Sequence, residues 1–377
     1  MPKLTLNDIC QYRNENMLST DLSDNVYIST ETMQPNREGI SSSDIVTPTT
    51  KKVKAFYPGD ILVSNIRPYF KKIWRATFAG GCSNDVLVFS PKCNSEYLYW
   101  LLSTDSFFNY MMATSKGTKM PRGDKKAIMK YIVPDHSDKE QRQIASFLNP
   151  LQNKIALNNR INDYLAELGK MIWAQTAKQA AKTVKIAEVA ADIVTGKTPS
   201  TKKPDNYGEE YPFITIPDMH SAVWLCSTER CLSEVGNSSQ PKKLVQRGSV
   251  LVSCIATVGL VGIVQKPSHF NQQINAVIPA NEGDEFYLYY AMHSIKQELL
   301  GIGATGSATL NVNKGAFSNI EIPWPERSAM DTYVRTVEPL FKAIETNTLE
   351  SLRLQELRDT LLPKLMSGEI DVSKVEI

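Results

Sequence analysis

The chain contains short runs that are similar to pieces of enzyme motifs, but none is complete. Thr195-Gly196-Lys197-Thr198 matches the end of a phosphate-binding P-loop, yet the glycine required five positions earlier is Ala191. Asn149-Pro150-Leu151 is not the Asn-Pro-Pro-aromatic run of an amino-methyltransferase, and we interpret Pro150 as a helix restart. No Gly-x-Ser-x-Gly or His-Glu-x-x-His run occurs. These absences favour a protein that binds and positions over one that catalyses.

Basic residues interleaved with aromatic residues are more informative. Positions 51–75 hold seven basic residues, one acid and five aromatic residues, and positions 116–130 hold six basic residues and one acid. The second half has smaller basic clusters at 197–203 and 242–247, whereas residues 326–377 carry ten acids and seven bases. Lys and Arg clusters of this kind neutralise phosphates, so they predict local nucleic-acid contacts.

Length and composition set the limits of this prediction. The 377 residues are 42% apolar and 22% charged, which predicts two to three globular domains. A net charge of +2 excludes a binder held by bulk charge. The six cysteines and four histidines form no metal-ligand pattern, so we expect reduced thiols and no metal. No apolar leader or membrane-length run occurs, so we expect a cytoplasmic protein without a membrane contact.

The second half of the chain repeats the first at an offset of 189 residues, the difference between positions 59 and 248. Gly59-Asp60-Ile61-Leu62-Val63-Ser64 matches Gly248-Ser249-Val250-Leu251-Val252-Ser253. The same offset relates Pro134 to Pro323. Because twice this offset nearly equals the chain length, the repeat defines the whole architecture.

Each half combines a globular part with a helical arm. The globular part opens on an alternating segment, Leu4-Thr5-Leu6 or Val184-Lys185-Ile186, and contains a short helix expected at 97–110 or 286–300. Further strands are expected at 26–28, 60–64, 85–89, 213–216, 249–253 and 262–264. The predicted fold class is α+β, with two pseudo-symmetric α/β domains separated by two long helices that form an antiparallel coiled coil. The predicted segments are a first domain at 1–137, a central arm at 138–181, a second domain at 182–325 and a C-terminal arm with tail at 326–377.

Apolar residues recur at steps of three and four along both arms, which is typical of a coiled-coil seam. Two such seams in one chain can bury each other in antiparallel sense, which predicts a dumbbell with a pseudo-twofold axis. The expected seam positions of the first arm are 144, 148, 151, 155, 165, 168 and 172. Those of the second arm are Val337, Leu340, Ile344, Leu354, Leu357 and Leu361.

Polar residues interrupt both seams. Asn158 and Asn162 in the first arm correspond to Asn347 and Ser351 in the second. A buried Asn in a seam fixes register at a cost in stability. Antiparallel packing therefore places Asn158 near Ser351 and Asn162 near Asn347. The alternative is that these residues face solvent.

The combination resembles the specificity subunit of type I restriction-modification systems. Besides the Gly59–Ser64 run, the first half has Lys116-Gly117-Thr118, and Ile132-Val133-Pro134 leads to Glu140-Gln141-Arg142-Gln143-Ile144 and a long helix. The run from Leu361 to Ile370 is similar to the usual C-terminus of that family. In the second copy Glu326-Arg327-Ser328-Ala329-Met330 replaces the Glu-Gln signature, so we expect weaker or different contacts there.

This resemblance implies a non-catalytic DNA reader. Each globular domain is then a target recognition domain for one half of a split double-stranded DNA sequence, and the arms set a spacing of about 34 Å, one helical turn. The implied partners are two copies of an adenine-N6 DNA methyltransferase subunit and an ATP-dependent restriction and translocase subunit. The chain itself needs no cofactor, because S-adenosylmethionine, Mg²⁺ and ATP belong to those partners.

On this interpretation the DNA-binding residues lie on loops of both domains, where Lys and Arg contact phosphates and polar side chains read base edges. The predicted residues are Arg67, Tyr69, Lys71, Lys72, Lys116, Thr118, Lys119, Arg122, Lys197, Thr198, Lys202, Lys203, Ser307, Thr309, Asn311 and Asn313. Two alternatives stay open. One is the recognition subunit of a type II or phase-variable methylation-only system, and the other is a coiled-coil scaffold that recruits proteins without binding DNA.

Overall fold

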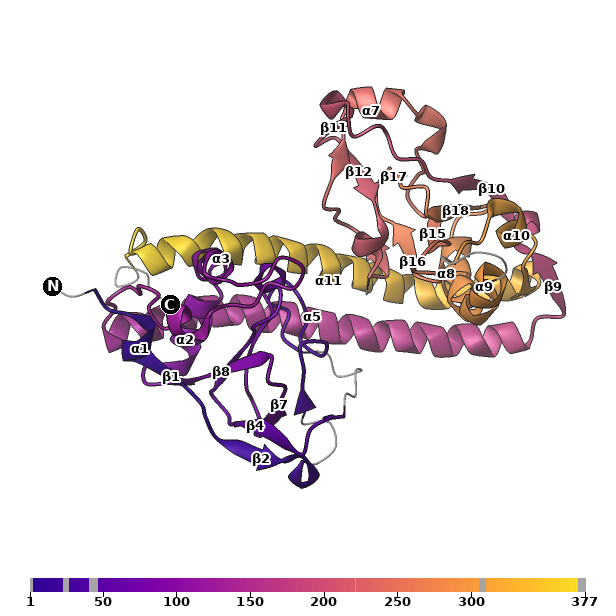
Figure 1. Ribbon diagram of the computed structural model, residues 1–377. Helices are drawn as coiled ribbons and strands as arrows, with labels where there is room; N and C mark the ends of the chain where they lie inside the picture. The colour runs from indigo at the N-terminus through magenta and orange to yellow at the C-terminus, as the bar shows by residue number, and fades with distance from the viewer. Residues whose placement is uncertain (1–2, 23–26, 41–46, 221, 305–309, 372–377) are drawn as a thin grey trace. The chain divides into compact units, whose positions relative to one another are not determined.

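The computed structural model describes residues 3–22, 27–40, 47–220, 222–304 and 310–371, and the chain divides into two compact units. Unit 1 comprises Met1–Ala156 and Arg353–Ile377, and unit 2 comprises Leu157–Leu352. Each unit contains a globular α/β part and a segment of each of two long helices (Figure 1). The predicted α+β class with two similar domains is confirmed.

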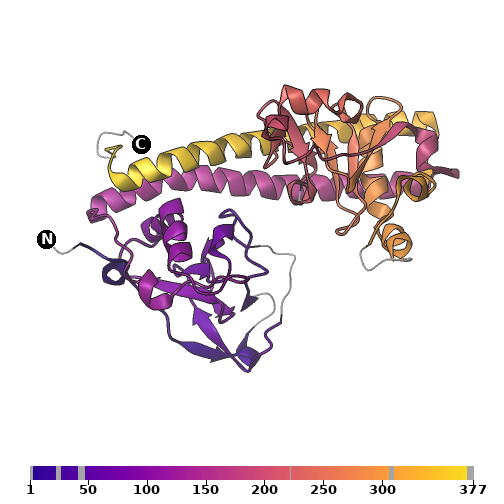
Figure 2. The same cartoon turned by 45° about the horizontal axis from the view of Figure 1, so that its top comes forward.

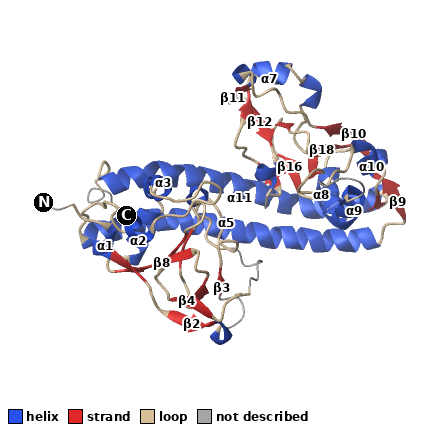
Figure 3. Cartoon of the chain, in the orientation of Figure 1, coloured by secondary structure: helices blue, strands red, loops and turns tan. Residues whose placement is uncertain are grey.

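In the described part of unit 1, two four-stranded sheets form the globular part (Figure 3). The antiparallel sheet has the order β1-β8-β5-β6, and the second has the order β2-β4-β7-β3 with β3 and β7 parallel. The strands are β1 (Cys10–Tyr12), β2 (Asn16–Leu18), β3 (Tyr27–Ile28), β4 (Lys52–Phe56), β5 (Ile61–Ser64), β6 (Ile73–Arg75), β7 (Gly80–Cys82) and β8 (Val86–Pro91). The helices are α1 (Leu6–Ile9), α2 (Ser95–Leu102), α3 (Asp105–Ala113), α4 (Lys125–Ile128) and the 3₁₀ turns η1 (Ser19–Asp21) and η2 (Pro68–Phe70).

In the described part of unit 2, the main sheet has the order β10-β18-β15-β16-β13, beside the sheets β11-β14-β12-β17 and β19-β9. Its strands are β9 (Lys182–Lys185), β10 (Ala190–Thr195), β11 (Tyr207–Gly208), β12 (Tyr211–Ile214), β13 (Trp224–Leu225), β14 (Cys231–Leu232), β15 (Val250–Ser253), β16 (Val261–Val264), β17 (His269–Phe270), β18 (Ile274–Pro279) and β19 (Glu321–Trp324). Its helices are α6 (Ile186–Val189), α7 (Glu234–Ser238), α8 (Asp284–Ser294), α9 (Lys296–Gly303), α10 (Lys314–Ser318), η3 (Pro204–Asn206), η4 (Ile216–Met219) and η5 (Pro241–Lys243).

The repeated hexapeptide is a strand buried on both faces in each unit. In β5, Ile61 and Val63 belong to the core that contains α2, whereas Leu62 belongs to the core on the opposite face. In β15, Val250 and Val252 belong to one core and Leu251 belongs to the core on the opposite face of the sheet. Burial on both faces explains why these strands are continuous apolar runs and do not alternate with polar residues.

Two predictions about short elements were wrong. Each expected short helix is a pair of helices, and in unit 1 Thr104 caps the second helix by accepting a hydrogen bond from the Phe107 amide at 3.3 Å. The opening strand expected at 184–186 is confirmed for Val184 and Lys185, which lie in β9, but Ile186 already begins α6. The one expected at 4–6 is wrong, because Leu6 begins α1 and Thr5 forms only an isolated bridge. Alternation over three residues is too short to distinguish a strand from a helical turn.

The long helices α5 (Asp138–Lys178) and α11 (Arg327–Ser367) begin and end at positions related by the repeat offset. Pro150 lies inside α5, so the prediction that a helix restarts there was wrong. Proline removes one backbone hydrogen bond from a helix. Buried neighbours such as Leu148 supply the tertiary packing that keeps α5 continuous.

Within unit 2 the two helices lie side by side with the predicted antiparallel register (Figure 2). Asn158 Nδ2 donates to Ser351 Oγ at 3.3 Å and to Glu350 Oε2 at 2.8 Å. Asn347 Nδ2 donates to Asn162 Oδ1 at 2.9 Å. Asn158 is fully buried, so the alternative of solvated asparagines fails at this position.

The seam prediction was wrong at one position in each arm. Leu168 and Leu357 are 42% and 45% exposed, and the buried positions next to them are Gly169 and Arg358. The seam takes a step of four residues where we expected three, and both copies differ in the same way. The residue type alone misled us, because leucine is the commoner seam residue.

This shift leaves exposed apolar residues at heptad spacing along α5 in unit 2. The apolar stripe consists of Leu157, Ile161, Tyr164, Leu168 and Met171. The corresponding positions of α11 are Thr346, Glu350, Arg353, Leu357 and Thr360, which are mostly polar. The stripe is therefore present on one long helix and not on its repeat.

The buried asparagines predict a stabilising double substitution. Asn158 Oδ1 is buried and has no hydrogen-bond partner within the described ranges, which costs stability. Asn158→Leu/Asn162→Leu is expected to raise the unfolding midpoint of unit 2 by about 2 to 4 °C, corresponding to about 1 kcal/mol, while loosening the helix register. Scanning calorimetry measures the midpoint, and Asn159→Leu at an exposed neighbouring position is the control. An unchanged midpoint in the double variant would contradict the register role.

The two long helices start with different contacts, as the altered Glu-Gln signature suggests. In unit 1, Gln141 Nε2 donates to the His136 carbonyl at 2.9 Å, and Gln141 Oε1 accepts from the Asn94 amide at 3.3 Å. In unit 2 the corresponding residue is the buried Met330. There Arg327 Nη1 donates to Asp284 Oδ1 at 2.8 Å and joins α11 to α8. An ion pair thus replaces the glutamine bridge.

Candidate nucleic-acid interface

The two predicted basic clusters of unit 1 meet beyond the end of β5. Ile66 and Arg122 form an antiparallel bridge, which joins residues 64–72 to residues 116–122. Lys116 and Arg122 exchange backbone hydrogen bonds of 2.9 and 3.0 Å, so the second loop is a hairpin. We call these two segments the unit 1 loop pair. It contains all eight residues predicted to contact DNA in the first domain.

Several of these side chains already have partners. The ion pairs join Lys116 to Asp124 at 2.9 Å, Arg122 to Asp85 at 3.1 Å and Lys71 to Asp105 at 2.8 Å. The Lys116 ammonium, with two backbone amides, lowers the pKa of Asp124 to about 2. Lys72 Nζ donates to the Thr30 carbonyl at 2.7 Å, and burial lowers the pKa of this ammonium.

Arg67 and Lys119 differ from these residues, since neither has a carboxylate partner among the described residues. Lys119 is exposed beside the exposed Thr118, and Arg67 is half-buried. An unpaired cation gives up no ion pair when it contacts a phosphate. Among the eight predicted residues of unit 1, Arg67 and Lys119 are thus the cations with no ion pair to give up, and their phosphate contacts stay a prediction.

The same loop arrangement occurs in unit 2 at the repeat offset. Ile255 and Asn311 form the corresponding antiparallel bridge. Ala256 has a left-handed backbone with φ 63°, as Arg67 does at the corresponding position with φ 50°. Low sequence identity between the copies conceals this shared geometry. The predicted residues Ser307 and Thr309 lie outside the described residues.

The remaining predicted residues of the second loop differ in what their side chains do. Asn311 is exposed at the bridge. Asn313 caps α10, because its Oδ1 accepts from the Ala316 amide at 2.9 Å. Asp124 caps α4 at the corresponding position of unit 1. The side-chain oxygen of Asn313 is therefore engaged, and its DNA contact stays a prediction.

The loop after β10 lies at the same edge of the main sheet. Thr195 at the end of β10 pairs with Asn275 near the start of β18, whose Ile274 pairs with Ser253 at the end of β15. This arrangement places the 196–203 loop beside the segment that follows β15. The exposed cations on it are Lys197, Lys202 and Lys203, and Thr198 Oγ1 donates to Gln272 Oε1 at 2.5 Å.

Sequence reasoning missed two kinds of residue near these loops. Phe70 is exposed next to Tyr69, and its position in an aromatic and basic run was an available signal. Arg37 supports the unit 1 loop pair from a segment 30 residues earlier, and no local pattern marks it. The contact of Arg37 with the unit 1 loop pair forms only in the folded chain, so the spacing of residues in the sequence does not predict it.

The described residues show no feature of a metal centre or a membrane span. No group of three or more His, Cys, Asp or Glu side chains within them is placed to hold a metal ion. No helix in the same ranges is both long and apolar enough to cross a bilayer. His269 is fully buried, and burial lowers its pKa to about 4, so it is neutral at pH 7.

Residues 2–167 and 179–355 match the type I restriction modification DNA specificity domain, and the chain belongs to this family. The HindI specificity subunit of a type I restriction enzyme from Haemophilus influenzae is 31% identical over 407 residues, covering 84% of this chain and 88% of that protein. The MjaVIII specificity subunit of Methanocaldococcus jannaschii is 22% identical over 389 residues, covering 93% and 87%. The crystal structure of the type I restriction-modification S subunit from M. genitalium shares the fold, with a TM-score of 0.59, 13% identity and coverage of 97% and 95%. The resemblance inferred from the sequence is confirmed.

Proposed function

We propose that this chain is a DNA-reading specificity subunit that recognises a split sequence, with one half-site for each unit. The observation that carries the proposal is the doubled loop pair. One bridge joins two polar loops at residues 66 and 122, and its counterpart joins two loops at 255 and 311. A reader of two separate half-sites needs two such edges, whereas a single-site binder needs one.

The chemistry of the loops suits a duplex. Unpaired cations such as Arg67 and Lys119 would hold phosphates, and the exposed Thr118 and Asn311 can form hydrogen bonds with base edges. The proposed role is non-catalytic, so methyl transfer, ATP hydrolysis and DNA cleavage fall to partner subunits. S-adenosylmethionine, Mg²⁺ and ATP would then bind those partners.

The proposed partners are two copies of an adenine-N6 DNA methyltransferase subunit and an ATP-dependent restriction subunit. The apolar stripe on α5 supports a protein partner, because exposed apolar residues at heptad spacing fit another amphipathic helix. We propose a half-site separation of about 34 Å, which puts both half-sites on one face of the duplex.

Methylome sequencing of a host with and without this chain tests the proposal. The expected result is one split motif, methylated at an adenine in each half, that disappears when the chain is removed. A continuous motif or an unchanged methylome would overturn it. A gel shift of the chain with a methyltransferase subunit separates this function from a scaffold that binds no DNA.

A substitution in the unit 1 loop pair tests which edge meets the DNA. Lys119→Ala in the assembled methyltransferase is expected to weaken binding to all sequences and to reduce the salt slope by about 1, as loss of one phosphate contact does. Fluorescence anisotropy titrations at several salt concentrations measure both quantities.

The matched control is Lys139→Ala. Lys139 is exposed in the first turn of α5. Gln141 of the same turn accepts from the Asn94 amide, and the neighbouring Ser95 donates to the Gly59 carbonyl, which places this turn toward the opposite end of β5 from the loop pair. Lys139→Ala should leave affinity and salt slope unchanged. If Lys119→Ala and Lys139→Ala have the same affinity and the same salt slope, the unit 1 loop pair does not contact the DNA.

A further inference from the structure

The tip of the unit 1 loop pair presents two aromatic rings to solvent. Tyr69 and Phe70 lie in η2, are 48% and 39% exposed, and have ring centroids 4.7 Å apart. Pro68, the first residue of the same turn, is buried and anchors it. Adjacent exposed aromatic rings form an apolar patch, and such patches on a polar surface mark binding sites more often than single exposed apolar residues do. The rings therefore call for a binding partner with an apolar face.

The backbone around these rings is strained. Left-handed backbone is unfavourable for residues with a side chain and concentrates at functional sites. Within the described ranges, the non-glycine residues with positive φ are Asn36, Arg37, Arg67, Lys71 and Ala256. Four of them belong to one assembly, because the amides of Asn36 and Arg37 donate to the carbonyls of Phe70 and Lys71 at 2.9 and 3.1 Å.

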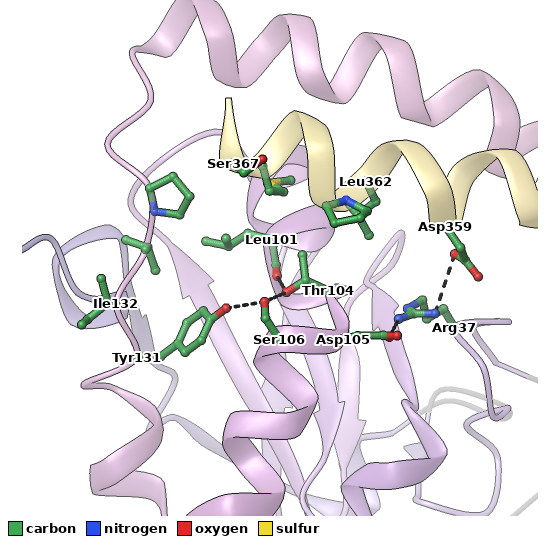
Figure 4. A pocket seen from close by; sticks show the side chains of 14 residues that line it. Arg37, Leu101, Thr104, Asp105, Ser106, Tyr131, Ile132, Asp359, Leu362 and Ser367 are labelled. Carbon is green, nitrogen blue, oxygen red and sulfur yellow. Dashed lines mark hydrogen bonds and ion pairs between the residues drawn. The ribbon is translucent and has the colours of Figure 1, made fainter. Parts of the chain in front are cut away.

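Arg37 anchors this assembly to the rest of unit 1. It is only 6% exposed, and its Nε donates to the Ser103 carbonyl at 2.6 Å. Figure 4 shows its guanidinium between Asp105, with which it forms an ion pair, and Asp359 of α11, 3.7 Å away. Lys71 shares Asp105. The tip is thus fixed before any ligand arrives, so binding need not order it.

Comparison of the two copies of the repeat shows that the exposed pair of aromatic rings is specific to unit 1. The corresponding segment of unit 2 is Ala256-Thr257-Val258-Gly259-Leu260, which contains no aromatic residue. Val258, which corresponds to Tyr69 in the repeat, is buried and has no ring to present to solvent. Both units keep the left-handed residue at the start of the turn, but only unit 1 places rings beyond it.

We propose that Tyr69 and Phe70 form an aromatic wedge that stacks on a nucleobase and partly unstacks one base step in the half-site read by unit 1. The inference rests on the proposed DNA function and adds to it a mode of reading. Apolar side chains that enter a duplex unstack base steps, and base stacking on aromatic rings is sequence-tolerant. Lys72, with Nζ 5.8 Å from the Phe70 ring centroid, supplies positive charge beside the wedge.

The test uses a duplex that carries the motif found by methylome sequencing, with 2-aminopurine placed at each position of both half-sites in turn. The full chain is bound together with its methyltransferase subunit. The methylated adenine, its pairing partner and the base pairs on either side are left out, because methyltransferases extrude their target base and so unstack its neighbours. A fluorescence increase is expected at one step of the unit 1 half-site and at no step of the other.

The substitutions separate a wedge from a charged contact. Tyr69→Ala/Phe70→Ala is expected to remove the fluorescence increase and weaken binding about tenfold at an unchanged salt slope. Tyr69→Phe/Phe70→Tyr keeps both rings and should retain the signal, while Tyr57→Ala removes an exposed ring at the other end of β5 and should change neither quantity. Arg37→Met acts on the support alone, and should reduce the signal with the rings still present.

A wild-type complex that binds its motif without unstacking any step would overturn the wedge and leave the proposed function standing. The same conclusion follows if the double alanine variant, shown by calorimetry to be folded, binds and unstacks as the wild type does. A wild-type complex that binds no duplex overturns the proposed function itself.

Discussion

Arg327→Met is expected to lower the free energy of unfolding of unit 2 by about 2 to 3 kcal/mol. Asp284 is fully buried, and its Oδ1 accepts from Arg327 Nη1 at 2.8 Å. Once the guanidinium is removed, Asn281 Nδ2, 2.9 Å from Oδ2, is the side-chain donor left to this carboxylate among the residues that the structure describes. Hydrogen exchange of the α8 amides in urea measures the change.

Two variants test the cause of this loss. Arg335→Met removes an exposed arginine of the same helix, whose side chain donates to Thr332 Oγ1 at 3.3 Å, and is expected to be near neutral. Asp284→Ser introduces the residue found at the corresponding position of unit 1 and should restore most of the stability of Arg327→Met. If it restores none, the buried carboxylate is not the source of the loss.

Gly196→Ala should destabilise unit 2 by about 3 kcal/mol and weaken DNA binding through the same loop. A Cβ at this position would lie 2.1 Å from the Asn271 carbonyl oxygen and 2.4 Å from that of Phe270. Both atoms belong to the backbone, so no side-chain rotation relieves the clash. Lys197, whose amide donates to the Phe270 carbonyl at 3.0 Å, would move with the loop.

Gly301→Ala is the matched control for this substitution. Gly301 lies in α9, and a Cβ there meets no atom within 4 Å. It should be neutral or stabilising by up to about 1 kcal/mol, since alanine favours a helix. Urea unfolding of both variants gives the comparison, and equal midpoints would show that the close approach at Gly196 is not rigid.

The repeat made much of the fold predictable, because each structural element is encoded twice in the sequence and the two copies can be compared. The arm expected at 138–181 is helix Asp138–Lys178, and the contact between Asn158 and Ser351 follows from antiparallel packing of equal arms. The error at Leu168 shows the limit of this reasoning. The seam could continue through Leu168 or through Gly169, one residue later. The rotation of the helix at that point, and not the residue type, determines which of the two faces the partner helix.

The loop edges could be predicted only in part. The clusters at 51–75 and 116–130 indicated cations, but their meeting through the bridge of Ile66 and Arg122 is a tertiary contact. Which cations are free depends on distant acids such as Asp85 and Asp105, and no sequence window contains both partners. The support from Arg37 depends on an even more distant residue, Asp359.

The composition of unit 1 from both ends of the chain affects the order of folding. Leu362, Leu365 and Met366 complete the core around α2, so this core stays open until residues 362–366 have left the ribosome. Unit 2 is one continuous segment and can close earlier. A product that stops before residue 353 would keep unit 2 and expose the core of unit 1, which makes it a substrate for proteolysis. Prematurely ended chains would therefore be cleared before they could compete for DNA.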